Sequence, residues 1–285
     1  MTTAKNSLLK PGPIGVFDSG FGGLTVLSEI KKLMPQYDYL YLGDNARAPY
    51  GSRSYELIYE FTLQAVKWLF AQGCQLVIIA CNTASAKALR TIQQNDLPQI
   101  DATKRVLGVI RPTAESITHI TKTKHVAVLG TSATIDSKSY EREIKELYPD
   151  IKVSAESCPM WVPLVENKEY NKPGADYFVK QHINKLLDKS NDIDTIILGC
   201  THYPLLINKI KDYTPKSIKL ISQGVYVAKS LREYLNRHKV LESLCSKDGT
   251  RVYCTTDSAE NFENIASFFL NEKITAKKVN LKISK

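Results

Sequence analysis

Short apolar runs alternate with amphipathic segments along the whole chain. The first apolar run, residues 14–17, is followed by a segment of helical character that Pro35 ends, and the same succession recurs to residue 269. The expected strands are 14–17, 37–42, 76–80, 106–110, 126–129, 153–157, 195–198, 218–221 and 251–254. The expected helices are 24–34, 55–72, 85–93, 113–120, 140–148, 175–187, 225–237 and 259–269. This alternation predicts an α/β fold with parallel sheets covered by helices on both faces.

The order of strand, polar turn, helix, strand and cysteine occurs twice, with a restart near residues 105–112. Two such units that face each other would enclose a cleft between two α/β domains. Residues 158–166 do not fit this order, and we expect them to form an irregular apolar loop. No shorter repeat is visible.

Two cysteines stand where an expected strand meets the segment after it. Cys81 lies in the string ACNT (80–83) and Cys200 in the string GCTH (199–202). This edge of an open α/β sheet is where ligands bind. A lone cysteine after an apolar strand is more often a small buried hydrophobe, and we interpret the other four in that way: Cys74, Cys158, Cys245 and Cys254. The polar residues after Cys81 and Cys200 indicate reactive thiols, and an N-terminal helix position would lower their pKa from about 8.5.

Two thiols that face one small molecule can invert a stereocentre. One removes a proton from one face of a carbon and the other delivers a proton to the opposite face, so that one begins as a thiolate and the other as a thiol. Asp18, Asp44 and His202 lie at the same sheet edges and are candidates to set these protonation states. The thiols suffice for such a reaction, so the sequence predicts neither a pyridoxal-type cofactor nor a metal site.

Two polar turns precede Cys81. The glycine-rich turn 18–23 has free backbone N–H groups that can hold a carboxylate, but its spacing does not match a nucleotide-binding fingerprint. The second turn brings Asp44, Arg47 and Tyr50 to the same edge of the sheet. Taken singly, Arg47 and Tyr50 favour a plain loop between a strand and a helix.

The composition, with 43% apolar and 24% charged residues, is that of a globular protein. The length of 285 residues is near the size at which a protein divides into two hydrophobic cores. The longest apolar run, 76–81, has about six residues against the roughly 18 that span a bilayer. The start, Met1–Lys10, lacks the apolar core of a signal peptide. We therefore expect a cytoplasmic protein without a membrane partner, whose six cysteines are free thiols.

The formal net charge is +9, and the end of the chain, 273–285, carries five lysines. A nucleic-acid surface would combine such charge with aromatic residues or a binding motif, and neither is present. A solvated lysine-rich surface is the favoured interpretation, and its positive field would help to collect an anionic metabolite. A regulatory or nucleic-acid-associated protein is the alternative from another class, but the paired cysteine motifs argue against it.

These motifs resemble those of the aspartate/glutamate racemase superfamily. The matching strings are residues 15–26, 42–44, 46–51, 80–86, 107–110, 128–131, 163–166 and 199–206. The resemblance covers most of the chain from residue 14 to about 257, and its two cysteine strings are highly specific. It implies two α/β domains related by a pseudo-twofold axis, with the active site in the cleft between them. Residues 1–111 and 225–285 would form the first domain, with Cys81, and residues 112–224 the second, with Cys200.

The resemblance also implies an activity: cofactor-independent racemisation of L-glutamate and D-glutamate, which supplies D-glutamate for cell-wall peptidoglycan. The alternative is racemisation of aspartate or another acidic amino acid by the same thiols. Cys81 and Cys200 would be the two acid/base residues, assisted by Asp18 and His202, with Asp44 and Glu166 as further candidates for tuning. The expected substrate-binding residues are Asp18, Ser19, Tyr50, Gly51, Asn82, Thr83, Thr201 and His202. The family further implies a homodimer.

Overall fold

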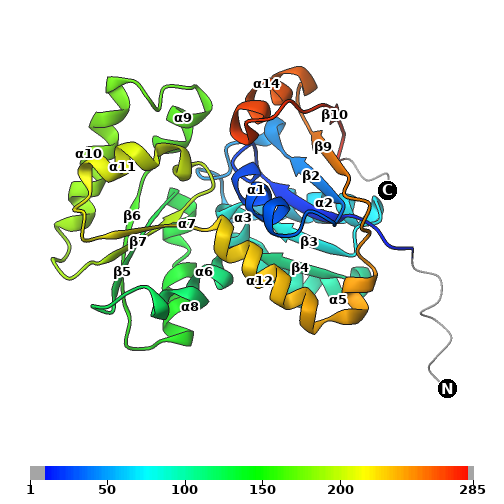
Figure 1. Cartoon of the computed structure of the whole chain (residues 1–285), viewed down its shortest axis with the longest axis horizontal. Coiled ribbons are helices and arrows are strands. Elements are labelled where there is room, and N and C mark those ends of the chain that lie inside the picture. The colour runs from blue at the N-terminus through cyan, green and yellow to red at the C-terminus, as the bar shows by residue number, and fades with distance from the viewer. Residues whose placement is uncertain (1–9, 282–285) are drawn as a thin grey trace.

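The computed structural model describes residues 10–281 and contains two parallel β-sheets, one in each lobe of the molecule (Figure 1). The larger sheet consists, in spatial order, of β10 (Ala276–Lys278), β9 (Arg251–Thr255), β2 (Tyr39–Gly43), β1 (Ile14–Asp18), β3 (Leu76–Ile79) and β4 (Arg105–Gly108). The smaller sheet consists of β6 (Lys152–Ser157), β5 (His125–Gly130), β7 (Thr195–Gly199) and β8 (Lys219–Ser222). Every pair of neighbouring strands is parallel, as the alternation of strands and helices predicts.

The two sheets share one strand order. The run β2-β1-β3-β4 in the larger sheet has its counterpart in β6-β5-β7-β8 in the smaller one. In both, the first strand along the chain lies between the second and the third, and this reversal of direction opens a crevice at the carboxyl ends of the strands. Cys81 follows β3 and Cys200 follows β7. The two thiols therefore occupy equivalent places in the two sheets.

Helices cover both faces of the larger sheet (Figure 1). They are α1 (Leu24–Leu33), α2 (Tyr55–Ala71), α3 (Asn82–Lys87), α4 (Leu89–Thr91), α5 (Leu97–Asp101), α12 (Gly224–Arg237), α13 (Lys239–Ser243) and α14 (Ala259–Leu270), with a 3₁₀ turn at Asn45–Arg47 and a π-helical segment at Ile92–Asp96. Successive residues of β1 point to opposite faces. Val16 packs in the core with α1, α12 and α14, whereas Phe17 packs in the core with α2 and α3.

The smaller sheet is covered in the same way. Its helices are α6 (Ile110–Ser116), α7 (Ser132–Asp136), α8 (Ser139–Leu147), α9 (Trp161–Glu166), α10 (Pro173–Leu187) and α11 (Ile207–Tyr213), with 3₁₀ turns at Ile117–His119 and Tyr203–Leu206. Val128 of β5 packs with α6 and α8, and Leu129 packs with α9, α10 and α11. Each sheet thus has two cores, because strands buried on both faces need an apolar partner on each.

The chain passes between the sheets twice. The first crossing runs from β4 to α6, through residues 108–110, and the second from β8 to α12, through residues 222–224. After the second crossing the chain rejoins the larger sheet, where β9 pairs with β2 and β10 pairs with β9. The strands β9 and β10 thus belong to the larger sheet, and the expected division of the chain into two domains stays a prediction.

Some local expectations are wrong. Residues 161–166 form the helix α9 rather than an irregular loop, because Trp161, Val162 and Val165 bury their side chains in the core. Pro163 lies in the first turn of α9, where a helix needs no N–H donor. The strand expected over 106–110 is β4 and ends at Gly108, and the helix expected over 85–93 begins at Asn82 and is broken near Ala88. The tail contains the strand β10, which is too short to show a periodic pattern.

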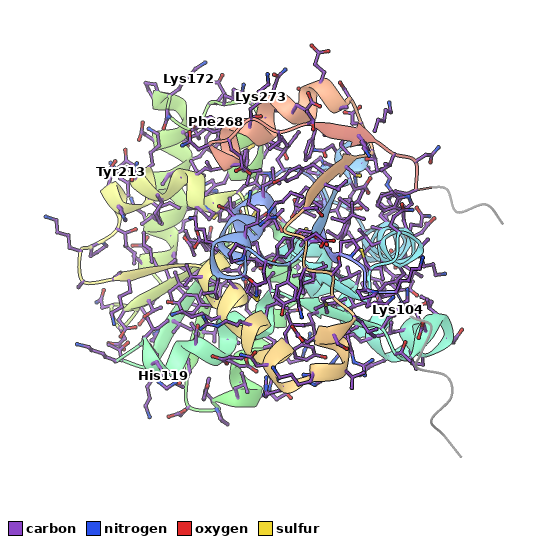
Figure 2. The ribbon with its side chains drawn as sticks, turned by 45° about the vertical axis from the view of Figure 1, so that its right-hand side comes forward. Lys104, His119, Lys172, Tyr213, Phe268 and Lys273 are labelled. Carbon is purple, nitrogen blue, oxygen red and sulfur yellow. The ribbon has the colours of Figure 1, made fainter. Side chains whose placement is uncertain are left out.

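Exposed lysine side chains come from separate parts of the chain. Figure 2 labels two of them, Lys172 and Lys273, at the edge of the molecule, whereas Lys104 is half-buried and donates to the Phe70 and Cys74 carbonyls. Such dispersal is typical of a solvated surface. Between residues 10 and 281 no helix has the length and apolarity that crossing a membrane requires. Most of the expected polar start, and the last four residues of the lysine-rich tail, lie outside the described residues.

Candidate active site

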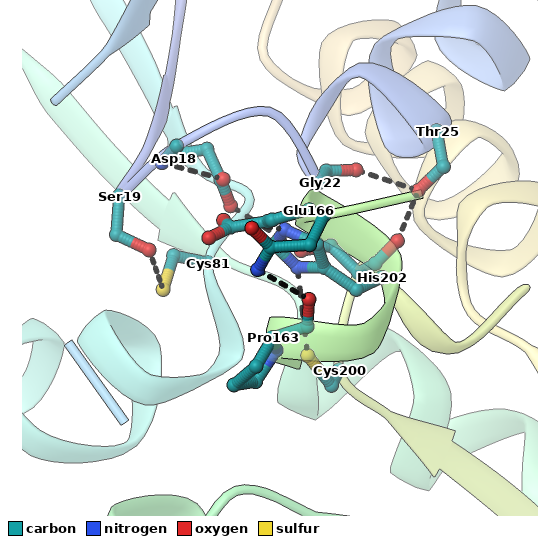
Figure 3. A network of polar contacts seen from close by, with 12 residues as sticks. Asp18, Ser19, Gly22, Thr25, Cys81, Pro163, Glu166, Cys200 and His202 are labelled. Atoms are coloured by element: carbon teal, nitrogen blue, oxygen red, sulfur yellow. Dashed lines mark hydrogen bonds and ion pairs between the residues drawn. The ribbon is translucent and has the colours of Figure 1, made fainter. Parts of the chain in front are cut away.

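A cavity of about 150 Å³ lies between the two sheets, and both Cys81 and Cys200 line it. Its wall also contains these predicted residues: Ser19, Tyr50, Gly51, Asn82, Thr83, Glu166, Thr201 and His202. They come from both lobes, since Cys81 follows β3 of the larger sheet and Cys200 follows β7 of the smaller one. In Figure 3, Ser19 and Cys81 lie on one side of the site and Cys200 and His202 on the other. The cavity is therefore the place where the two halves of the molecule present their thiols together.

Cys81 caps the N-terminus of α3. Its sulfur accepts a hydrogen bond from the Ala84 N–H at 3.5 Å and lies 3.3 Å from Ser19 Oγ. Burial nevertheless raises the pKa of the Cys81 thiol to about 12, and the nearby Asp18 charge raises it further, against the effect of these hydrogen bonds. The expectation that the helix N-terminus lowers this pKa is wrong for Cys81, because loss of water outweighs a helix of six residues. At neutral pH this raised pKa favours the thiol form of Cys81.

Cys200 has a different neighbourhood. The chain forms a turn after it and enters a 3₁₀ turn at Tyr203, so the expected helix N-terminus is absent at this site. Instead, His202 Nδ1 lies 3.8 Å from Cys200 Sγ, and His202 Nε2 lies 3.1 Å from Glu166 Oε1. Burial lowers the pKa of His202, but its contacts with Cys200 and Glu166 raise it by more, to about 10. His202 is then an imidazolium at neutral pH and places a positive charge 3.8 Å from the Cys200 sulfur.

Asp18 lies behind the wall of the cavity and is fully buried. One carboxylate oxygen accepts from the Gly20 N–H at 2.9 Å, and the other lies 3.5 Å from Thr201 Oγ1. Burial raises the pKa of Asp18, and the charge of His202 opposes this shift. Asp18 is therefore placed to act on the site through the Thr201 hydroxyl and through its charge.

The turn after β1 packs tightly against the segment after β7. A Cβ atom on Gly22 would lie 2.2 Å from Thr201 Oγ1 and 2.5 Å from His202 Nδ1, so only glycine fits there. Thr25 Oγ1 lies 2.8 Å from the Gly22 carbonyl and 3.1 Å from the Thr201 carbonyl (Figure 3). The larger sheet thus holds the Cys200 segment in position through its own polar turn.

Asp44 holds the loop that carries Tyr50. The Tyr50 hydroxyl and Arg47 Nε both donate to the Asp44 carboxylate, the latter at 2.7 Å. Thr256 Oγ1 donates to its other oxygen at 2.9 Å. Asp44 was expected to tune a cysteine, but its contacts give it a different task, which is to keep the Tyr50 ring in the cavity wall.

Sequence reasoning missed three hydroxyl groups in the cavity wall, those of Ser52, Thr131 and Ser132. Thr131 Oγ1 lies 2.9 Å from Thr83 Oγ1, so the turn after β5 contacts the helix that follows Cys81. A signal for Thr131 and Ser132 exists, because their turn has the glycine and hydroxyl pattern of the turn after β1. The residues that line the cavity show that both turns reach it, through Ser19 in one and Thr131 and Ser132 in the other.

The arrangement joins two thiols with hydroxyl, amide and imidazole groups that can bind a small polar anion. Within residues 10–281, no group of three or more His, Cys, Asp or Glu side chains is placed to hold a metal ion. The chemistry that these residues themselves can perform is proton transfer between two sulfur atoms and one bound molecule.

Known proteins share this sequence and architecture. A glutamate racemase of Streptococcus thermophilus is 39% identical over 270 residues, which cover 94% of this chain and 96% of that protein. A crystal structure of a glutamate racemase isoform from Bacillus anthracis matches with a TM-score of 0.87 and 36% identity, covering 96% of this chain and 99% of that one. The Francisella tularensis glutamate racemase in complex with D-glutamate matches with a TM-score of 0.84 and 32% identity, covering 95% and 98%.

These matches confirm the predicted fold class and the predicted glutamate racemase function. A family model described as Asp/Glu/Hydantoin racemase matches residues 22–229, which is well over half of the chain. The chain belongs to the Asp/Glu/hydantoin racemase family.

Proposed function

We propose that Cys81 and Cys200 carry out the interconversion of L-glutamate and D-glutamate as the two acid/base residues of this enzyme. The observation that carries the proposal is that both sulfurs line one cavity of about 150 Å³. The thiols occupy equivalent positions in two sheets of the same strand order. Two equivalent groups from two facing lobes can reach one carbon from opposite sides.

In one direction, the Cys200 thiolate takes the α-proton of the bound amino acid. The C–H bond breaks, and its electron pair is delocalised into the α-carboxylate. The Cys81 thiol then delivers its proton to the opposite face of the same carbon. When the product enantiomer is released, Cys81 is the thiolate and Cys200 is the thiol. The reverse reaction begins from that state, and the charges balance.

The electrostatics of the cavity support Cys81 as the proton donor in this direction. The raised pKa of Cys81 favours its thiol form, and the positively charged His202 lies 3.8 Å from the Cys200 sulfur. A substrate ammonium group near Cys81 would offset the Asp18 charge and lower that pKa again. The Ser19, Thr83 and Thr201 hydroxyls, all in the wall, are positioned to bind the substrate carboxylates.

We further propose that the enzyme acts in the cytoplasm as a homodimer and supplies D-glutamate for peptidoglycan. We also propose two domains, residues 1–111 with 225–285 and residues 112–224. The pairing of β9 with β2 supports this division, since it brings the end of the chain back to the larger sheet.

The experiment measures α-proton exchange and optical rotation in deuterated water, with glutamate and aspartate assayed side by side. We expect exchange of either glutamate enantiomer without an added cofactor. Cys81→Ala and Cys200→Ala should each abolish net racemisation. Cys254→Ala, which removes a buried thiol outside the cavity wall, is the control and should retain activity. Full turnover by either active-site variant would remove the two-base mechanism, and faster turnover of aspartate would overturn the choice of substrate.

A further inference from the structure

Three buried polar side chains form a closed ring of hydrogen bonds next to the cavity. The Tyr140 hydroxyl donates to Asn82 Oδ1 at 2.6 Å, and Asn82 Nδ2 donates to Gln223 Oε1 at 2.6 Å. Gln223 Nε2 closes the ring by donating to the Tyr140 hydroxyl. Gln223 Nε2 also lies 3.3 Å from the Val109 carbonyl, which can only accept. That carbonyl fixes the orientation of the Gln223 amide and hence the direction of the whole ring.

The ring joins every part of the chain that links the two lobes. Asn82 begins α3 on the larger sheet and Tyr140 lies in α8 on the smaller one. Gln223 lies in the second crossing, between β8 and α12. Its Nε2 reaches Val109, in the first crossing, and Thr113 Oγ1, at 3.2 Å, in the helix that follows it. One side chain therefore binds both crossings and both lobes.

The ring is shielded from water, since Asn82, Tyr140 and Gln223 are only 2%, 3% and 3% exposed. Hydrogen bonds in such surroundings strengthen one another, and a donor or acceptor left without its partner is costly. Movement of one lobe relative to the other about the crossings would separate Asn82 from Tyr140. The intact ring thus favours one arrangement of the lobes.

In this arrangement of the lobes, residues from both lobes together line the cavity. Asn82 lines the cavity and directly follows Cys81 in the chain. We propose that Gln223 is a positioning residue which, with Tyr140, holds Asn82 and the two crossings so that both thiols face one substrate. The inference rests on the proposed function of the thiols, but it concerns a group that lies outside the reaction itself.

The expected kinetic effect of losing the ring follows from the populations of the different lobe arrangements. Without the ring, the lobes also sample arrangements that do not bind substrate, and the apparent affinity falls by the fraction that remains competent. Once substrate holds the lobes together, the thiols have their normal positions. Loss of the ring should therefore raise KM and leave kcat nearly unchanged.

The test compares Gln223→Met and Tyr140→Phe, which remove polar atoms and keep most of the shape, with the double variant. We expect each single variant to raise KM about tenfold, which corresponds to ~1.4 kcal/mol, with kcat within about threefold of wild type. The double variant should resemble the single ones, because loss of either member opens the ring. Thr62→Val is the matched control: it removes a buried hydroxyl whose hydrogen bond to the Ile58 carbonyl stays within α2, and it should leave KM unchanged.

A second measurement separates positioning from general stability. Hydrogen exchange should become faster in the two crossings of Gln223→Met, residues 108–110 and 222–224, and stay unchanged in β1. An unchanged KM with a lowered thermal midpoint would overturn the proposal, as would KM effects that add in the double variant. If Gln223→Met does not fold, Tyr140→Phe, which removes one hydroxyl, decides the question. A wild-type enzyme that does not racemise glutamate would refute the proposed function before any variant is compared.

Discussion

At the scale of single residues, the two cysteines lie in unlike electrostatic surroundings. Cys81 is buried near the Asp18 charge, which raises the pKa of its thiol, whereas Cys200 lies beside His202. The raised pKa favours the thiol form of Cys81. The direction in which Cys81 must remove the α-proton therefore starts from the less favourable form of that residue.

The raised pKa of His202 predicts how stability depends on pH. Its ordinary value of 6.5 applies to the unfolded chain, and the value in the folded protein is about 10. The resulting stabilisation is complete below pH 6.5 and is lost as the pH rises toward 10, by at most ~1.4 kcal/mol per pH unit. We expect the free energy of unfolding of the wild type to fall between pH 7 and 9 more steeply than that of His202→Asn. Urea denaturation at a series of pH values measures both slopes, and parallel curves would contradict the assignment.

At the scale of elements, the helix α9 shows why a short segment can escape prediction. Two prolines, Pro159 and Pro163, and an unbroken apolar stretch favour a loop when the sequence is considered alone. In the folded protein Trp161 is completely buried, and its ring centre lies 4.8 Å from that of Tyr203. This contact joins the helix that carries Glu166 to the turn that follows His202.

Removal of the Trp161 ring should therefore loosen both segments. We expect Trp161→Ala to lower the free energy of unfolding by about 3–5 kcal/mol, because a large cavity replaces the ring. The surviving folded protein should also have a lower kcat/KM, since Glu166 and His202 lose their support. Met160→Ala is the adjacent control, with a side chain that is 40% exposed, and should change stability by less than about 0.5 kcal/mol. Denaturant unfolding and initial rates measure both effects, and equal losses in the two variants would refute this role of α9.

At the scale of the whole molecule, the site exists only because two halves meet closely. Cys81 and Cys200 are 119 positions apart in the chain, and the turn with Gly22 closes the gap between the lobes. The tightness of this contact is what brings Thr201 and His202 into the same cavity as Ser19.

A single methyl group at Gly22 tests this contact. In Gly22→Ala the new Cβ would overlap Thr201 Oγ1 and the His202 ring, so one segment must move. We expect kcat/KM to fall at least tenfold, because small displacements of catalytic groups have large effects on rate. Gly174→Ala is the control, since its Cβ would meet no atom within 4 Å. Circular dichroism verifies the fold of both variants, and wild-type kinetics for Gly22→Ala would show that the contact is not needed.

Local patterns in the sequence determined most elements and singled out the two cysteines that line the cavity. The fully buried strands β1, β3, β5 and β7 each contain a continuous apolar run, and such runs are visible without any knowledge of the fold. The polar residues after Cys81 and Cys200 indicated reactive thiols for the same reason, because they interrupt an otherwise apolar pattern. These are properties of neighbours in the chain.

Tertiary structure alone decided the electrostatics and the outer parts of the site. Residues distant in sequence determine three features of the site. These are the raised pKa of Cys81, the position of Asp18 behind the cavity wall and the position of Thr131 in that wall. The ring that includes Gln223 joins positions up to 141 residues apart. Burial removes water from a group only when separate segments pack around it, and no local pattern of residues records which segments those will be.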